Sequence, residues 1–163
     1  MTGISHHLAA VELAFVLHLP PLGLGAAFFG AILPDLCDQR LSSLLSCTRR
    51  GRARRFAALH RGTSHWFGLW LGLLLLGDGL DVFCNELLTG LGIGALSHLL
   101  LDALTPRGIP LLPFVGRIRL ALPLCRTGSL GEYGLLLVFS LLFAWFFGAD
   151  LWKKLAAILF TAF

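Results

Sequence analysis

The amino-acid sequence predicts an all-α protein, a compact membrane-embedded bundle of about five helices with an N-terminal helical hairpin. Composition places the chain in a bilayer, because 56% of its 163 residues are hydrophobic, only 13% are charged and the mean hydropathy is +0.81. Apolar stretches of helical length recur along the chain, and prolines and glycines end them. The length suits a single domain, residues 1–163.

The first two predicted helices cover residues 6–19 and 22–33. Two consecutive prolines separate them, and a third proline follows the second helix. Each helix is shorter than the roughly 20 residues needed to cross a hydrocarbon core, so the stretch is either a hairpin or one kinked span. The prolines and glycine between the helices favour the hairpin, which brings His6 back towards Asp35.

Three more helices are predicted at residues 66–76, 87–104 and 130–149. The arginine-rich segment 40–59 is expected to be a surface loop or a short interfacial helix. Segment 109–124 contains three prolines and is expected to be irregular, with room for a short extended pair. The helix at 130–149 is the best candidate for a true membrane span because of its length and uniform hydrophobicity.

Two glycines four residues apart interrupt the apolar helix predicted at 87–104. Gly90 and Gly94 lie on the same helix face and have no side chain to keep a neighbour at a distance. Small residues at this spacing are typical of close helix packing in membranes. We therefore expect another helix to pack against this face.

Arginines gather in two connections and set the predicted orientation of the chain. These connections hold Arg49, Arg50, Arg52, Arg54, Arg55 and Arg61, and Arg107, Arg117, Arg119 and Arg126. The positive-inside rule puts both connections in the cytoplasm. Anionic lipid headgroups are the expected counter-charge, whereas nucleic acid is not an expected partner because the first cluster lacks interleaved aromatic residues.

Ionisable residues recur at the ends of the hydrophobic helices that adjoin the arginine-rich, cytoplasmic connections. The candidates are Asp35, Asp38, His60, Arg61, His65, His98 and Asp102. Such groups are costly in an apolar setting, so their recurrence indicates a shared task, for which holding a metal ion is the leading interpretation. His98 and Asp102 form the sharpest pair because residues four apart share a helix face. The structural alternative is a histidine and a carboxylate that satisfy each other inside the bundle.

The other motifs also have structural alternatives. Asp35 and Asp38 follow a proline, where aspartate often forms turns. In residues 60–65, HRGTSH, Gly62 permits a tight turn before a helix N-terminus that favours a bound anion such as phosphate. Glu132 either complements the dipole of the last helix or joins the site.

Three histidines need discounting. His18 lies beside the prolines at the far end of the predicted hairpin, where a structural or interfacial role is expected. His6 and His7 are adjacent and point to different sides of a helix, so at most one should enter the site. The four cysteines, at positions 37, 47, 84 and 125, show no C-x-x-C pairing and are assigned neither zinc nor disulfides.

Several motifs in chain order carry a family resemblance. His6, LPDLCD at 33–38, HRGTSH at 60–65 and SHLLLDALTPRGIPLL at 97–112 resemble the YdjM-like family of inner-membrane metal-dependent hydrolases. The resemblance covers about residues 5–135, the expected metal-site core. It extends distantly to zinc-dependent phospholipase C and P1 nuclease, all-helical enzymes that cleave phosphodiesters. It implies a protein of the inner (cytoplasmic) membrane. The predicted helices make this protein multi-pass, and the positive-inside rule turns its site towards the cytoplasm.

The resemblance also implies a set of metal ligands. The principal metal would be bound by Asp35, His65, His98 and Asp102, and His6 would join Asp102 at a neighbouring one. Ser64 stands where threonine is expected in the family motif. No histidine follows Asp102, so one or two Zn²⁺ ions are expected, with Mn²⁺ or Fe²⁺ as alternatives.

Such ligands suit a hydrolase that uses a metal-activated water. Asp35 or Asp38 is the candidate general base, and Arg61 is the candidate for stabilising charge on the transferred group; His60 is placed in the catalytic set with them. A location at the membrane edge favours a lipid or lipid-linked phosphoester as the substrate. The expected function is therefore a membrane metal-dependent hydrolase of phospholipase C-like type.

Two non-catalytic functions stay open. Buried histidine and aspartate are equally natural in a metal or proton translocator, which predicts a polar path across the bilayer. The remaining ionisable residues of the last three predicted helices do not form such a path. In the second alternative the chain is a scaffold whose arginine-rich loop binds acidic lipid or a partner.

Overall fold

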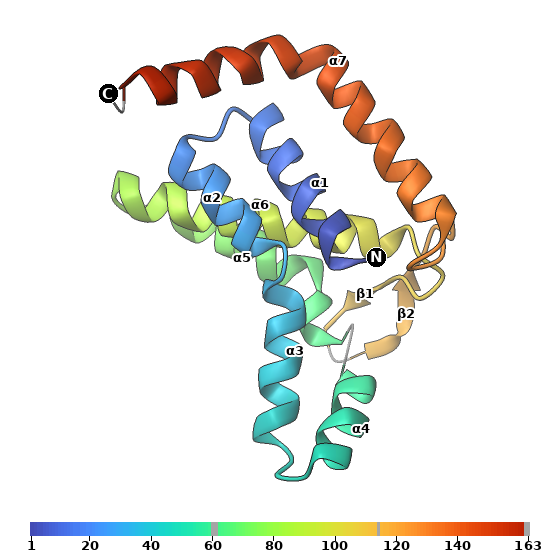
Figure 1. Cartoon of the computed structure of the whole chain (residues 1–163). Helices are drawn as coiled ribbons and strands as arrows, with labels where there is room; N and C mark the ends of the chain where they lie inside the picture. The colour runs from blue at the N-terminus through green and yellow to red at the C-terminus, as the bar shows by residue number, and fades with distance from the viewer. Residues whose placement is uncertain (60–61, 114, 162–163) are drawn as a thin grey trace.

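The computed structural model describes residues 1–59, 62–113 and 115–161, which form seven α-helices, one short 3₁₀ helix (η1) and one strand pair (Figure 1). The elements are α1 Gly3–Val16, α2 Pro21–Gly30, α3 Leu33–Leu44, α4 Arg49–Leu59, η1 Thr63–His65, α5 Phe67–Gly77, α6 Val82–Ala103, β1 Ile109–Leu112, β2 Val115–Leu120 and α7 Leu130–Thr161. The fold is mostly helical, as predicted, but its helices are more numerous than the five expected.

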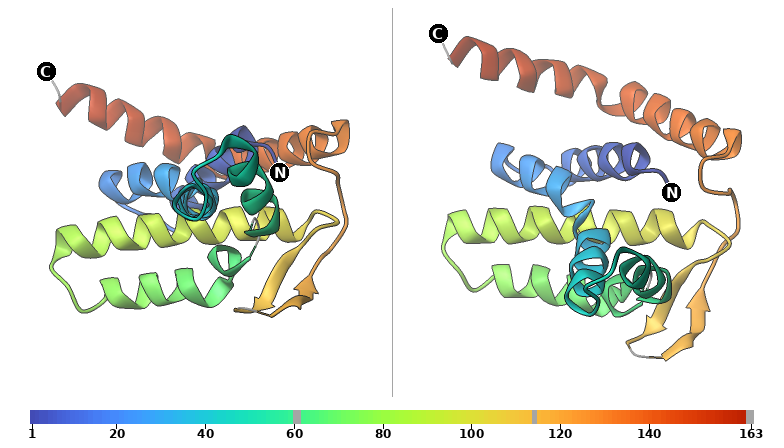
Figure 2. Two further views of the ribbon diagram at one scale, coloured as in Figure 1. Left: turned by 90° about the horizontal axis from the view of Figure 1, so that it is seen from below. Right: turned by 60° about the horizontal axis from the view of Figure 1, so that its bottom comes forward.

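Helix α6 is the central element of the fold. Helices α1 and α2 pack on one side of it and α5 on another, so that layers of α7, α1 with α2, α6 and α5 follow one another in Figure 2. A buried cluster of Trp70, Ala95, Leu99, Ala103 and Ile109 joins α5, α6 and β1. The ligand candidates on α6 are thus surrounded by other elements.

The N-terminal hairpin is present. Helices α1 and α2 lie against each other, and the turn between them contains His18, whose φ of 57° is left-handed. Pro21 occupies the first turn of α2, where its missing N–H costs nothing. Because the chain reverses here, the N-terminal end of α1 and the C-terminal end of α2 meet beside the same end of α6.

The close packing predicted at Gly90 and Gly94 is also confirmed. A Cβ atom at Gly90 would collide with the backbone of Gly23, and one at Gly94 with the backbone of Ala27. Gly30 of α2 is equally close to the backbone of Leu91. Small residues on both helices therefore allow α2 and α6 to approach to backbone contact.

The second predicted helix ends earlier than expected, and this changes the setting of two aspartates. Helix α2 stops at Gly30, and Pro34 lies in the first turn of a new helix, α3, instead of terminating the old one. Proline is favourable at that position because the first N–H groups of a helix have no intrahelical partner. Asp35 and Asp38 consequently lie in the first two turns of α3.

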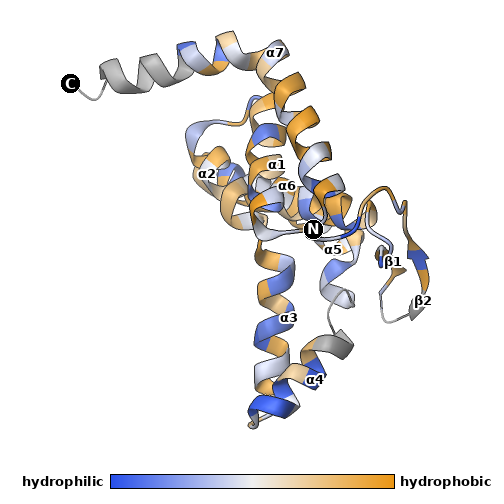
Figure 3. Cartoon of the chain, turned by 45° about the vertical axis from the view of Figure 1, so that its right-hand side comes forward, coloured by the Kyte–Doolittle hydropathy of each residue, from blue (hydrophilic) through white to orange (hydrophobic). Residues whose placement is uncertain are grey.

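Segment 40–59 is helical rather than a loop. Helix α3 continues to Leu44, and α4 carries the arginines at 49, 50, 52, 54 and 55, all exposed. The two helices project away from the other elements (Figure 1), and hydrophilic and hydrophobic residues alternate along α3 (Figure 3). Arginine has a high helix propensity, which explains why a charged segment without apolar periodicity forms a helix.

The remaining boundaries differ modestly from the prediction. Helix α6 begins five residues earlier than expected, because the Asp81 side chain accepts a hydrogen bond from Cys84 N and caps it. The extended pair predicted in segment 109–124 is present as β1 and β2, antiparallel with Ile109 opposite Leu120. Helix α7 continues past residue 149 to Thr161.

In the described part of the chain, two helices are long and apolar enough to cross a membrane, α6 and the Leu130–Lys153 part of α7. A third span results if α2 and α3, which meet at a bend of 45°, are counted as one. Helices α1 and α5 are apolar but shorter. The composition of these helices agrees with an intramembrane location.

Candidate metal centre

Four donor atoms converge beside the C-terminal end of α6. His65 Nε2 lies 3.5 Å from Asp35 Oδ1 and 3.8 Å from Asp102 Oδ2, and His98 Nε2 lies 3.8 Å from each of the same two oxygens. The donors come from α3, η1 and α6, three elements that are distant in sequence. We call Asp35, His65, His98 and Asp102 the principal cluster.

Two groups of three donors could hold a metal ion, Asp35 with His65 and His98, and His6 with His98 and Asp102; within each group the donor atoms lie within 4.8 Å of one another. A tetrahedral Zn²⁺ with ligand bonds of about 2.0–2.1 Å separates its ligand atoms by about 3.3 Å. The four measured separations, 3.5–3.8 Å, exceed this value by a few tenths of an ångström. Two imidazole nitrogens and two carboxylate oxygens suit Zn²⁺, Mn²⁺ or Fe²⁺.

His98 is oriented by the backbone of the neighbouring hairpin. Its Nδ1–H donates a hydrogen bond of 2.6 Å to the carbonyl oxygen of Ala31, just after α2. This bond fixes the tautomer, so the Nε2 lone pair points into the cluster. The Nε2 atom is buried and has no hydrogen-bond partner among the described residues. A metal ion would satisfy this atom.

His65 is oriented by Asp38 and Ser64. Asp38 Oδ2 lies 3.4 Å from His65 Nδ1, on the ring edge away from the principal cluster, and Ser64 Oγ lies 3.0 Å from the same nitrogen. Ser64 also donates to Asp38 Oδ1. Such a carboxylate–histidine contact is typical of the groups that position metal-binding histidines. Asp38, which is buried, is therefore placed to hold His65 rather than to contact the centre of the cluster.

Three carboxylates surround His65 with negative charge. Burial lowers the pKa of its imidazole, but hydrogen bonds with Asp35 and Asp38 and the charge of Asp102 outweigh burial and raise the pKa overall. The site thus favours positive charge at His65, either a proton on the ring or a cation beside it. Because metal and proton compete for the same nitrogen, metal binding here would release a proton.

The turn that carries His65 is held by two tryptophans. Trp70 Nε1 on α5 donates to the carbonyl of Ser64 at 2.7 Å, and Trp66 Nε1 donates to the carbonyl of Leu111 on β1 at 3.2 Å. The strand pair and α5 therefore fix η1 beside α3 and α6. A ligand on a short turn gains the rigidity of the packed helices in this way.

His6 lies at a second position next to the cluster. Its ring stacks on His98 with centroids 3.7 Å apart, and its Nε2 is 3.6 Å from Asp102 Oδ1. The Met1 amino nitrogen lies 2.7 Å from the same oxygen. Asp102 thus directs Oδ2 to the principal cluster and Oδ1 to His6, the arrangement expected of a carboxylate shared between two cations.

His7 and His18 lie away from the cluster. His7 donates from Nδ1 to the carbonyl of Phe28 at 2.8 Å and stacks on the Phe28 ring. His18 is exposed in the turn at the opposite end of the hairpin. The expectation that at most one of His6 and His7 enters the site agrees with these positions. His60 and Arg61 lie outside the described residues.

Glu132 joins α7 to α1. Its Oε1 accepts hydrogen bonds from Thr2 N, Thr2 Oγ1 and Ser5 Oγ at 2.6–2.9 Å, and its Oε2 accepts one from Gly128 N at 2.7 Å. The side chain is fully buried. The sequence had left Glu132 open between a helix-dipole partner and a site residue; these bonds favour a structural role at the start of α1.

The sequence could not have identified the backbone and hydroxyl groups that orient the ligands. The Ala31 carbonyl has no sequence signal, because any residue would supply it. Ser64 was noticed only as a departure from the family motif, yet its hydroxyl contacts both His65 and Asp38. A hydroxyl residue directly before a candidate ligand histidine was the signal available.

The fold and the cluster define a class: a helical membrane protein that gathers histidines and carboxylates at one end of its central helix. The chain belongs to the YdjM inner membrane protein family, whose model matches residues 1–163. It is also similar to a Bacillus subtilis (strain 168) protein named "Uncharacterized protein YvsG", with 31% identity over 146 residues, 81% of this chain and 85% of that protein. No solved structure gives a significant match.

Proposed function

We propose that this protein is a membrane-embedded metal-dependent hydrolase that cleaves a phosphoester of a lipid or lipid-linked substrate. The observation that carries the proposal is the convergence of His65 Nε2 and His98 Nε2 on Asp35 Oδ1 and Asp102 Oδ2, each contact 3.5–3.8 Å long. Zn²⁺ is the proposed metal, and Mn²⁺ and Fe²⁺ are alternatives with the same ligand preferences. The family name and the two span-length helices support the membrane location.

The residues divide into ligands and groups that position them. Asp35, His65, His98 and Asp102 would hold the metal, while Asp38 and the Ala31 carbonyl keep the two imidazoles turned towards it. A metal bound there with an open position supplies an activated water at neutral pH and polarises a phosphoryl oxygen. A second ion beside His6 would share Asp102.

Asp35 is also the best placed general base, through Oδ2, the oxygen that makes none of the cluster contacts. Its side chain is 37% exposed, whereas Asp38 and Asp102 are almost fully buried. A base must reach both the nucleophile and the solvent to which its proton is returned. Asp38 faces the outer edge of His65 and lacks this access. The catalytic roles of His60 and Arg61 stay predictions from the sequence.

The arrangement of charge supports a site at the cytoplasmic edge of the membrane. Helix α4, which carries five exposed arginines, follows directly after α3, and α3 carries Asp35. The acidic residues Asp78 and Asp81 precede the other end of α6, about 30 Å away at 1.5 Å per residue. The positive-inside rule then orients the cluster towards the cytoplasm, where α4 would meet anionic lipid headgroups.

The experiment compares native chain with His98→Ala and His7→Ala, all purified in detergent. Bound metal is measured by elemental analysis, and release of phosphate or headgroup is measured on water-soluble phosphoesters and phospholipids. We expect His98→Ala to lose bound metal and to lower turnover at least about 100-fold, because one of four ligands is gone. His7→Ala removes a histidine from the same region but outside the cluster, so bound metal and turnover should both stay at the native level.

Two results would contradict the proposal. Unchanged metal content in His98→Ala would remove His98 from the ligand set. Native protein that binds metal in the cluster but hydrolyses none of the phosphoesters would favour the translocator over the hydrolase, and transport of the metal into vesicles would then be measured.

A further inference from the structure

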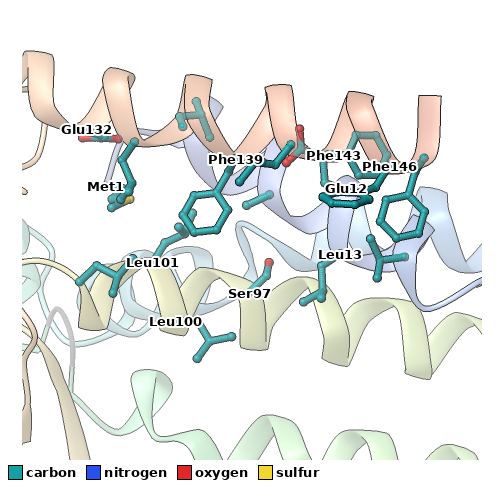
Figure 4. A pocket seen from close by; sticks show the side chains of 17 residues that line it. Met1, Glu12, Leu13, Ser97, Leu100, Leu101, Glu132, Phe139, Phe143 and Phe146 are labelled. Carbon is teal, nitrogen blue, oxygen red and sulfur yellow. The ribbon is translucent and has the colours of Figure 1, made fainter. Parts of the chain in front are cut away.

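A cavity of about 430 Å³ lies between α1, α6 and α7 (Figure 4). This volume falls within the range of about 300–1,000 Å³ that is usual for small-molecule sites. Most of its lining is leucine and phenylalanine, chiefly from α7 and α6. It lies outside the principal cluster, and the proposed chemistry does not use it.

The polar side chains in the lining are already hydrogen-bonded within the chain. Glu12 accepts from Ser140 at 2.7 Å, Ser97 donates to the carbonyl of Gly94 at 2.7 Å, and Glu132 accepts from Thr2, Ser5 and Gly128. Each of these polar side chains has a partner within the chain, and the rest of the lining offers an occupant apolar contacts. The lining therefore selects a hydrocarbon rather than a polar molecule.

One end of the cavity lies next to the metal cluster. Met1 and Glu132 line that end in Figure 4, and the Met1 amino nitrogen contacts Asp102 Oδ1. Leu101, which precedes Asp102 on α6, also lines the cavity. A molecule with a polar head at the cluster can thus continue as an apolar chain along α7.

The cavity also has the length and surroundings of a lipid tail. Its α7 lining runs from Glu132 to Phe147, about 22 Å of helix at 1.5 Å per residue. One leaflet of the hydrocarbon core is about 15 Å deep, so the lining reaches past the middle of a bilayer. None of the most apolar window of α7 is buried inside the fold, and three lining residues, Phe139, Leu142 and Phe146, are at least half exposed, so the cavity is open to where lipid would be.

We propose that the cavity between α1, α6 and α7 binds one acyl chain of the lipid whose phosphoester lies at the metal cluster. The inference rests on the proposed function for the position of the head group, and it assigns a membrane phospholipid, with a long hydrocarbon chain, as the substrate class. A second copy of this chain or an unspecific annular lipid are the competing occupants.

The probe is phosphatidic acid with a photoreactive diazirine in one acyl chain, added to the full-length protein in detergent. After illumination, labelled residues are mapped by mass spectrometry. Labelling should fall on inward-facing residues such as Leu101 and Phe143, and long-chain phosphatidic acid should compete while glycerol phosphate should not. Labelling confined to outer-face residues such as Val138 and Leu141 would overturn the proposal.

Two neighbouring leucines of α7 provide a matched pair of variants. Leu136 lines the cavity and Leu137, 60% exposed, lies outside the lining. Leu136→Trp should weaken competition by long-chain lipid about tenfold, roughly the loss of burial of two methylene groups, whereas Leu137→Trp should leave it unchanged. Equal effects of the two, with both variants eluting as folded protein, would overturn the proposal. If Leu136→Trp does not fold, Ala9→Leu takes its place. It fills the cavity from α1 and should likewise weaken competition by long-chain lipid about tenfold.

The design separates this proposal from the hydrolase. Labelling is read without turnover, so labelling at Leu101 and Phe143 in His98→Ala would support the cavity even if the native chain cleaved no phosphoester. Hydrolysis of water-soluble phosphoesters without labelling in the cavity would retain the hydrolase and end the acyl-chain proposal. No lipid adduct in the cavity, together with elution of the purified protein as a dimer, would identify a second copy as the occupant and also end it.

Discussion

Helices α6 and α7 are both long and apolar enough to cross a membrane, yet they have different surroundings. In α6, 39% of the most apolar window is buried inside the fold, and the helix carries His98 and Asp102. In α7 none of that window is buried, and its described residues contribute no donor to the principal cluster. Two apolar helices of spanning length thus serve two purposes: α6 is a scaffold that holds ligands, and α7, the more hydrophobic of the two, is a surface for lipid.

The difference appears in the residues that the two helices use. Gly90 and Gly94 bring α6 into backbone contact with α2, whereas Gly134 and Gly148 of α7 have nothing within 4 Å of an added Cβ. Large exposed apolar side chains, such as Trp145 at 83% exposure, cover α7 instead. In a bilayer, close packing rather than hydrophobicity holds helices together, so the glycines of α6 should matter most.

The largest effect is expected from a bulky residue at the α2–α6 contact. Gly94→Leu places a side chain against the backbone of Ala27, which cannot move aside as a flexible side chain could. We expect a loss of at least about 3 kcal/mol of stability, seen as a lower yield of folded protein and a lower unfolding midpoint in detergent. Gly148→Leu makes the same change on α7 and should leave the yield and the unfolding midpoint unchanged. Equal midpoints for the two variants would mean that α2 and α6 are not packed in this way.

The second prediction concerns Asp38 on α3, which orients the ligand His65 beside α6. Asp38→Asn weakens the contact that orients His65 but removes no ligand of the principal cluster. We expect metal affinity to fall about 10–100-fold, the usual cost of losing a group that positions a ligand histidine. Metal affinity is measured by competition with a chromophoric chelator.

Asp78→Asn is the control for that measurement. It makes the same change at an exposed aspartate beyond the other end of α6 and should leave the affinity unchanged. A loss greater than about 1,000-fold in Asp38→Asn would instead identify Asp38 as a metal ligand, and no loss would show that Ser64 alone orients His65.

The sequence predicted the parts of the fold that depend on local signals. Proline pairs and glycines identified the hairpin, and the spacing of Gly90 and Gly94 identified the α6 contact. The helix at 33–44 was missed because Pro34 was taken as an end; proline is equally compatible with the first turn of a new helix. For arginine-rich α4 the sequence left a loop and a short helix open, because its amphipathic pattern is weak and only helix propensity supports the helix.

The candidate site divides in the same way. His98 and Asp102 are four apart on one helix, so their proximity followed from helix geometry. Their meeting with Asp35 and His65 could not follow from spacing, because it depends on how α3 and η1 pack against α6; the family resemblance implied it instead. The groups that orient the ligands, such as the Ala31 carbonyl, depend on tertiary structure alone.

The third prediction concerns the buried carboxylate of α7, which lies away from the metal site. Glu132→Gln replaces an acceptor of four hydrogen bonds with an amide whose NH₂ group must face donors, so we expect a loss of about 1–3 kcal/mol in the free energy of unfolding. Bound metal should be retained, because the bonds of Glu132 join α7 to α1 and not to the principal cluster. Asp150→Asn, at an exposed position of the same helix, should change stability by less than about 0.5 kcal/mol. Metal loss in Glu132→Gln at unchanged stability would show that α7 takes part in the site, and the contrast between the two helices would then fail.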